Sequence, residues 1–122
     1  MELNYFDRVA LSTFTSLEKQ SLYQLLNAAM IIDGNRDSRE IAIINEVNRI
    51  IGVIVADVEA SRKLSEPTMT SCLRNMETLK KAYVGKFIAQ VILADGVITQ
   101  REEQFFYFYV VFQIIEYFFI CY

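Results

Sequence analysis

The amino-acid sequence predicts an all-α fold of six to seven helices in a single domain that spans residues 1–122. Apolar residues recur at intervals of three and four along most of the chain, which is the period of an amphipathic helix. The chain contains only four glycines and one proline. An all-β sandwich needs a turn about every 8–12 residues, so this composition argues against it.

The N-terminal half carries the signals of three helices. Residues 1–12 predict a short helix with apolar side chains at Leu3, Phe6, Val9 and Ala10. Thr15 and Glu18 match the T-x-x-E capping box and open a second helix, which we expect to stop at Asp33-Gly34. The predicted inward face of this second helix consists of Leu22, Leu25, Leu26, Ala29 and Met30. A third helix opens at the D-x-x-E box of Asp37 and Glu40 and closes at Gly52. Its predicted inward residues are Ile43, Ile44, Val47, Ile50 and Ile51.

Four further helices are predicted in the C-terminal half. Residues 56–64 are predicted to form a short charged helix. The next helix opens at Ser65-Glu66-Pro67, a pattern typical of a helix cap and first turn, and is predicted to reach about Met76. A long helix from about Glu77 to Ala94 ends at Asp95-Gly96. Its inward residues are predicted to be Leu79, Tyr83, Phe87, Ile88, Val91 and Ile92. The capping box of Thr99 and Glu102 opens the last helix, which runs from about Gln100 to near the C-terminus.

One motif, D-G-x5-E, occurs twice, with Asp33 and Glu40 in the first copy and Asp95 and Glu102 in the second. Both copies follow an apolar helix and precede another, so residues of about 17–52 and 77–113 form two similar halves. Calcium-binding EF-hand loops also contain D-G-x5-E. Loop positions 1 and 3 would be apolar in both copies here, which excludes a conventional EF-hand.

The repeated motif in a small acidic all-α domain resembles the tellurite-resistance TerB family and the N-terminal domain of the DjlA co-chaperones. The resemblance covers roughly residues 17–113; the second copy, Ala94 to Glu102, matches well, whereas the first has Ile32 in place of alanine. It implies two pseudo-symmetric helical halves and a stress-associated role. It also implies that carboxylates of the two turns lie close together and bind a divalent metal, with Asp33, Asp37, Glu40, Asp95 and Glu102 as the candidate ligands.

The same carboxylates have a purely structural interpretation. Asp33 and Asp95 can accept hydrogen bonds from amides of their own turns, and acidic residues stabilise helix N-termini. If a metal binds, it is a hard ion such as Ca²⁺, Mg²⁺ or Mn²⁺, because the chain has no histidine and neither cysteine lies near the motifs. Both interpretations stay open at this point.

Composition argues against several classes of function. The absence of histidine and of any Gly-rich phosphate loop argues against an enzyme, and Glu102-Glu103 is typical of a solvated first turn. Net charge is −3 and the basic residues are scattered, so we expect no nucleic-acid partner. The N-terminus does not resemble a signal peptide, which favours the cytoplasm. We expect Cys72 and Cys121 to be free thiols there, with a disulfide as the alternative.

Residues 105–122 hold ten of the sixteen Phe and Tyr residues of the chain. Gln113 and Glu116 interrupt this segment, which argues against a membrane span. Shifting the sequence by 62 residues aligns the polar positions Asn45, Glu46, Asn48 and Arg49 with Tyr107, Phe108, Val110 and Val111. A polar helix face in the first half is therefore apolar in the second, and an apolar face of this kind marks an interface. We predict a homodimer or a protein partner at these four residues; the alternative is that the tail from Ile114 folds back over them.

We therefore expect a non-enzymatic, stress-associated interaction module that resembles the TerB family, and the resemblance implies a divalent metal at the two acidic turns as an alternative to capping alone. The first alternative is a ligand-free scaffold or oligomerising subunit. The second is a membrane-associated protein that uses its aromatic C-terminal helix.

Overall fold

The computed structural model describes residues 3–32, 37–94, 96 and 98–108, and no strand occurs in these ranges. Its helices are α1 (Tyr5–Leu11), α2 (Ser16–Ile31), α3 (Ser38–Ile51), α4 (Val55–Lys63), α5 (Glu66–Arg74), α6 (Thr78–Leu93) and α7 (Gln100–Phe106). The all-α prediction is confirmed for this part of the chain. The last helix is predicted to continue to near the C-terminus, but residues 109–122 lie outside the described ranges.

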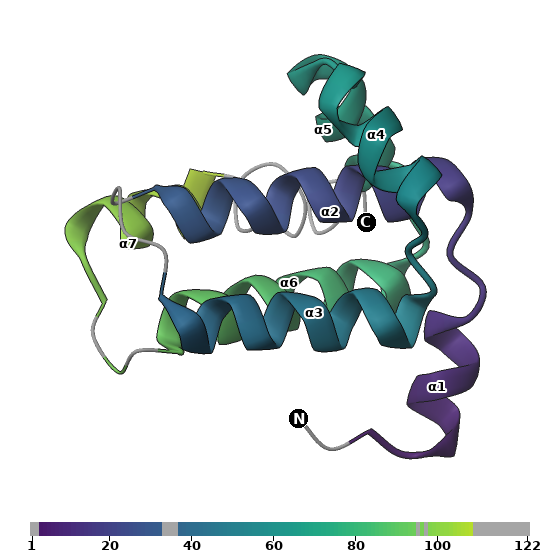
Figure 1. Ribbon diagram of the computed structural model, residues 1–122, viewed down its shortest axis with the longest axis horizontal. Helices are drawn as coiled ribbons and strands as arrows, with labels where there is room; N and C mark the ends of the chain where they lie inside the picture. The colour runs from purple at the N-terminus through teal and green to yellow at the C-terminus, as the bar shows by residue number, and fades with distance from the viewer. Residues whose placement is uncertain (1–2, 33–36, 95, 97, 109–122) are drawn as a thin grey trace.

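Helix α2 is the central element of the fold. It contacts α3, α4, α5 and α6, and α3 also packs on α6. The three long helices α2, α3 and α6 run along the long axis of the molecule, with α4 and α5 at one end and α7 at the other (Figure 1). Helix α1 lies at the end opposite α7 and contacts α3 and α6.

The predicted caps fix most helix starts. Thr15 with Glu18, and Thr99 with Glu102, form complete capping boxes, and the Ser65 hydroxyl accepts the Thr68 N–H. Gly52 ends α3 in the left-handed conformation at φ 79°, which is the reason that glycine suits this position. The structure adds a box that the sequence analysis did not identify, formed by Asn4 and Asp7 at the start of α1.

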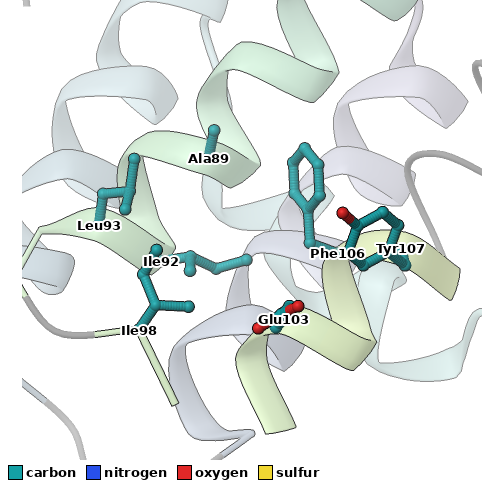
Figure 2. Close-up of a pocket in the computed structure, with 7 residues that line it drawn as sticks. All are labelled: Ala89, Ile92, Leu93, Ile98, Glu103, Phe106 and Tyr107. Atoms are coloured by element: carbon teal, nitrogen blue, oxygen red, sulfur yellow. The ribbon is translucent and has the colours of Figure 1, made fainter. Parts of the chain in front are cut away.

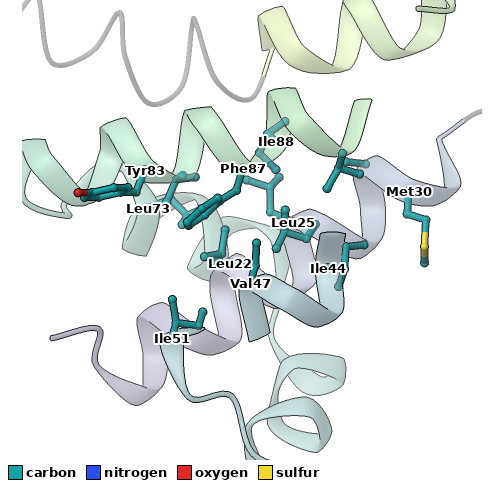
Figure 3. Packing of buried hydrophobic residues seen from close by; sticks show 14 of the residues in the cluster. Leu22, Leu25, Met30, Ile44, Val47, Ile51, Leu73, Tyr83, Phe87 and Ile88 are labelled. Carbon is teal, nitrogen blue, oxygen red and sulfur yellow. The ribbon is translucent and has the colours of Figure 1, made fainter. Parts of the chain in front are cut away.

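One cluster of buried apolar side chains fills the space between the helices (Figure 3). The predicted inward face of α2 is buried throughout, and Ile44, Val47 and Ile51 of α3 are buried opposite it, with Ile43 and Ile50 partly buried. The prediction for α6 is correct for its other inward residues but wrong for Leu79, which is 56% exposed. The neighbouring Lys80 is buried instead.

Lys80 is buried because its ammonium group finds partners inside the protein. Nζ lies 2.8 Å from Glu18 Oε1 and donates to the Thr13 carbonyl oxygen at 3.0 Å. It also lies 5.4 Å from the centre of the Phe14 ring. Burial raises the pKa of Glu18, but hydrogen bonds from Lys80 and from the Thr15 N–H outweigh it, and the pKa is lowered overall. This ion pair ties the start of α6 to the start of α2.

A second polar contact attaches α1 to α6. The Tyr83 hydroxyl donates to Asp7 Oδ1, and Asp7 Oδ2 accepts the Asn4 N–H in the capping box. The hydrogen bond from Tyr83 lowers the pKa of Asp7, and the same bond raises the pKa of Tyr83. The carboxylate of Asp7 therefore closes the first turn of α1 and holds that helix on α6.

Candidate functional site

The helix ends that flank the two D-G-x5-E turns lie at the same end of the molecule. The end of α2 and the start of α3 flank the first turn, and the end of α6 and the start of α7 flank the second (Figure 1). Asp33 and Asp95 themselves lie outside the described residues. The expectation that these two carboxylates face each other therefore stays a prediction.

The described carboxylates of the two motifs are held within their own helix starts. Asp37 Oδ1 accepts the Arg39 N–H at 2.7 Å, and the Arg39 guanidinium contacts both carboxylate oxygens at 3.0 and 2.9 Å. The Arg39 side chain and backbone lower the pKa of Asp37 to about 2. Glu102 Oε1 accepts the Thr99 N–H at 3.1 Å, and its side chain is almost completely buried. These contacts agree with the capping interpretation for Asp37 and Glu102.

Glu40, the counterpart of Glu102 in the first motif, is buried to a similar extent. In the described part of the chain, no three His, Cys, Asp or Glu side chains are grouped so that they could hold a metal ion. The metal site predicted at Asp33, Asp37, Glu40, Asp95 and Glu102 depends on two residues outside that part, so it stays a prediction.

An apolar groove opens between α6 and α7 (Figure 2). It has a volume of about 340 Å³ and is lined by Ala89, Ile92, Leu93, Ile98, Glu103, Phe106 and Tyr107. We call this surface the α6–α7 groove. Leu93, Ile98 and Tyr107 are each about half exposed, at 50%, 54% and 49%. Apolar side chains that large are normally covered when they gather in one place, so the groove is a candidate interface.

The predicted interface residues lie at and beyond this groove. Tyr107 lines it, and the neighbouring Phe108 is 51% exposed, whereas Val110 and Val111 lie outside the described residues. Asn45 of α3, which aligns with Tyr107 after the shift of 62 residues, is exposed as well.

Sequence reasoning missed the wall that α6 contributes to this groove. Leu93 is not among the residues predicted inward, and Ile98 falls in a predicted turn. A usable signal was present, because Ala89 and Leu93 are four residues apart and so share a helix face. The return of the chain at Gly96, where φ is 76°, brings that face beside α7.

The remaining predictions are tested only in part. Cys72 is a free thiol whose pKa is raised by burial, and Cys121 lies outside the described residues. Within the ranges that the structure describes, no helix is both long enough and apolar enough to cross a membrane.

A comparison of the chain with protein families, curated proteins and solved structures finds no match. The resemblance to the TerB family therefore rests on the two D-G-x5-E motifs alone. What the structure itself contributes is an all-α architecture with an exposed apolar groove at α6 and α7.

Proposed function

We propose that this chain is a non-enzymatic interaction module that forms a homodimer through the α6–α7 groove and the adjoining Phe108. The observation that carries the proposal is the exposure of three large apolar side chains around one groove: Leu93, Ile98 and Tyr107. Phe108 follows Tyr107 in the sequence and is also exposed, beside residues of α5. Aromatic side chains are enriched at the centres of protein interfaces, where they lose their contact with water.

A second copy of the chain is the partner that we propose. In a two-fold dimer one patch contacts the same patch on the other copy, so a single groove supplies both sides of the interface. Glu103 is the charged residue that lines the groove, and the other lining residues are apolar or aromatic. Because most of the lining is apolar, it can pack on the same lining of a second copy.

Light scattering over a range of micromolar concentrations tests the proposal. We expect the wild-type chain to have the mass of a dimer, and Phe108→Glu to dissociate it while the helical circular dichroism is retained. Loss of an aromatic contact at an interface costs about 2 kcal/mol when that residue is a hot spot, which is about a thirtyfold rise in the dimer Kd. Tyr107→Glu is a second variant in case the first fails to fold.

Val55→Glu is the matched control. Val55 is 74% exposed and is the first residue of α4, a helix that lies away from α7 (Figure 1). An acidic residue in the first turn of a helix is tolerated, so this variant should dimerise like the wild type. A wild-type chain that is monomeric at every concentration would overturn the proposal. Retention of wild-type affinity in Phe108→Glu and Tyr107→Glu would also overturn it.

A further inference from the structure

Helix α1 turns hydrophobic side chains toward solvent. Tyr5, Phe6 and Val9 are 76%, 80% and 46% exposed, and the first two are the most exposed large hydrophobic side chains of the described residues. The polar residue Asp7 lies on the inward side instead, where it accepts a hydrogen bond from the Tyr83 hydroxyl. A surface helix normally has the reverse arrangement, with its polar residues outward. We call Tyr5, Phe6 and Val9 the apolar face of α1.

Contacts on the inner side of α1 fix the orientation of this face. Leu11 is buried in the core, and the hydrogen bond between Asp7 and Tyr83 ties the helix to α6. The Tyr5 and Phe6 rings meet edge to face, with their centres 6.0 Å apart. A rotation of α1 that covered the two rings would break the contacts of Asp7 and Leu11, so the rings stay exposed in the free chain.

Basic groups accompany the apolar face of α1. Arg8 is exposed on the same helix and forms no ion pair among the described residues. Lys86 of α6 is also exposed. It lies close enough to Asp7 to help lower the pKa of that carboxyl, after the hydrogen bonds from Tyr83 and from the Asn4 N–H. Two positive charges therefore lie at α1 in a chain whose net charge is −3.

The acidic groups that these charges act on are already engaged. Asp7 is hydrogen-bonded within α1 and to α6. Glu46 of α3 accepts hydrogen bonds from Arg49, which lower its pKa, and Arg8 adds a smaller electrostatic contribution. Arg8 and Lys86 are therefore the charges that this side of the molecule offers to a partner. Exposed aromatic rings beside basic groups are complementary to a bilayer surface with acidic lipids, which is anionic outside and apolar beneath.

We infer that the apolar face of α1, together with Arg8 and Lys86, docks on the surface of an anionic lipid bilayer. Tyr5 and Phe6 enter the interfacial region, where aromatic side chains are favoured, and the two basic groups contact the lipid phosphates. A helix of seven residues lies on such a surface and does not cross it. Helix α1 lies at the end opposite α7 (Figure 1), so this inference is independent of the dimer proposed at the α6–α7 groove.

Vesicle binding tests the inference. We expect the wild-type chain to sediment with vesicles that contain phosphatidylglycerol and much less with vesicles of phosphatidylcholine alone. Salt should weaken the binding, because it screens the attraction between basic groups and acidic lipids. Phe6→Ala should weaken it about tenfold or more, and Arg8→Gln about fivefold. Because the chain has no tryptophan, Phe6→Trp supplies a single fluorophore, whose emission should move to shorter wavelength on the anionic vesicles.

Matched controls come from the other end of the molecule. Ile31 is 48% exposed at the end of α2, and Arg101 is exposed on α7, both away from α1 (Figure 1). Ile31→Ala and Arg101→Gln should bind vesicles like the wild type, and the emission of Ile31→Trp should not move. All the exchanged residues are exposed, so the helical circular dichroism should be the same in every variant.

Three outcomes would overturn the inference. The first is a wild-type chain that does not bind the anionic vesicles. The second is equal vesicle binding by Phe6→Ala and Ile31→Ala. The third is a chain that ignores vesicles but changes its oligomeric state in Phe6→Ala, because the apolar face of α1 would then serve a contact between proteins.

Discussion

Replacing Lys80 by methionine tests the buried ion pair that joins α2 and α6. Methionine keeps most of the volume of the lysine stem but removes the ammonium group, so Glu18 loses the contact at 2.8 Å and the Thr13 carbonyl loses its donor at 3.0 Å. Removal of one partner of a buried pair costs about 3–5 kcal/mol because a charge is left without compensation. Glu18 keeps the Thr15 N–H at 2.8 Å, and its side chain is 13% exposed. We therefore expect the lower value, about 3 kcal/mol.

Thermal and urea unfolding, followed by circular dichroism at one fixed protein concentration, measure this loss. For a chain of this size about 3 kcal/mol corresponds to a fall in Tm of about 12 °C. Lys63→Met removes an exposed lysine from α4 and should change the free energy of unfolding by no more than about 0.5 kcal/mol. If Lys80→Met were as stable as this control, the buried pair would contribute nothing and the reasoning would be refuted.

The effect should also depend on pH, and the sign follows from Glu18. Its pKa is lower in the folded protein than its ordinary value of 4.5. Its stabilising contribution is therefore present above pH 4.5 and is lost as the pH falls through the folded value. The difference in stability between wild type and Lys80→Met should shrink on acidification below pH 4.5. A difference that stays constant down to pH 2 would contradict the assigned role of Glu18.

Three further predictions concern other contacts. Tyr83→Phe removes the hydroxyl that donates to Asp7, so nuclear magnetic resonance titration should show the pKa of Asp7 rise toward its ordinary value of 3.8. Hydrogen exchange of the α1 amides should also become faster. An unchanged pKa of Asp7 would exclude this contact. Gly52→Ala places a Cβ at φ 79° and should lower the unfolding free energy by about 1 kcal/mol in urea titrations, and an unchanged midpoint would show that the strain is relieved. Millimolar Ca²⁺ or Mn²⁺ should leave Tm unchanged, because the Asp37 and Glu102 carboxylates accept hydrogen bonds from backbone amides at the starts of their helices. A rise in Tm with the ion that Asp33→Ala and Asp95→Ala abolish would instead establish the metal site that the TerB resemblance implies.

Local signals predicted the helices well because each acts within a few residues. The pairs Thr15–Glu18 and Thr99–Glu102 are recognised from spacing alone, and the structure has both boxes. The capping box at Asn4 was not predicted, because the third residue after this cap is Asp7 rather than the usual glutamate or glutamine.

Burial was harder to predict, because hydropathy does not show which partners a side chain will meet. Leu79 was predicted to face inward but is 56% exposed, whereas the neighbouring Lys80 is buried. The partners that allow Lys80 to be buried, Glu18 and the Thr13 carbonyl, lie more than sixty residues away in the sequence. Helical periodicity alone therefore cannot show which of these two neighbouring residues at the start of α6 is buried, because contacts with residues distant in the sequence determine it.

The candidate site was predicted in part: its aromatic residues were identified from the sequence, but the α6 side of the groove was not. The aromatic residues from Phe105 onward stand out in the sequence, and Tyr107 and Phe108, which directly follow α7, are half exposed. Local patterns predicted that one helix ends at Asp95-Gly96 and that the next opens at Thr99, but they do not show how α6 and α7 pack against each other. The position of Glu103 in the groove becomes visible only once α6 and α7 are placed side by side.

The position of α2 has a consequence for how the chain can be divided. The Gln24 amide nitrogen donates to the Ser61 and Leu64 carbonyls, so a side chain of α2 pairs with carbonyl groups at the C-terminal end of α4. Helix α2 also contacts α3 and α6. A cut between α5 and α6 would leave an N-terminal fragment whose central helix exposes the surface that α6 had covered. The two sequence halves therefore cannot behave as independent folding units, and separated fragments should regain native structure only by reassembling around α2.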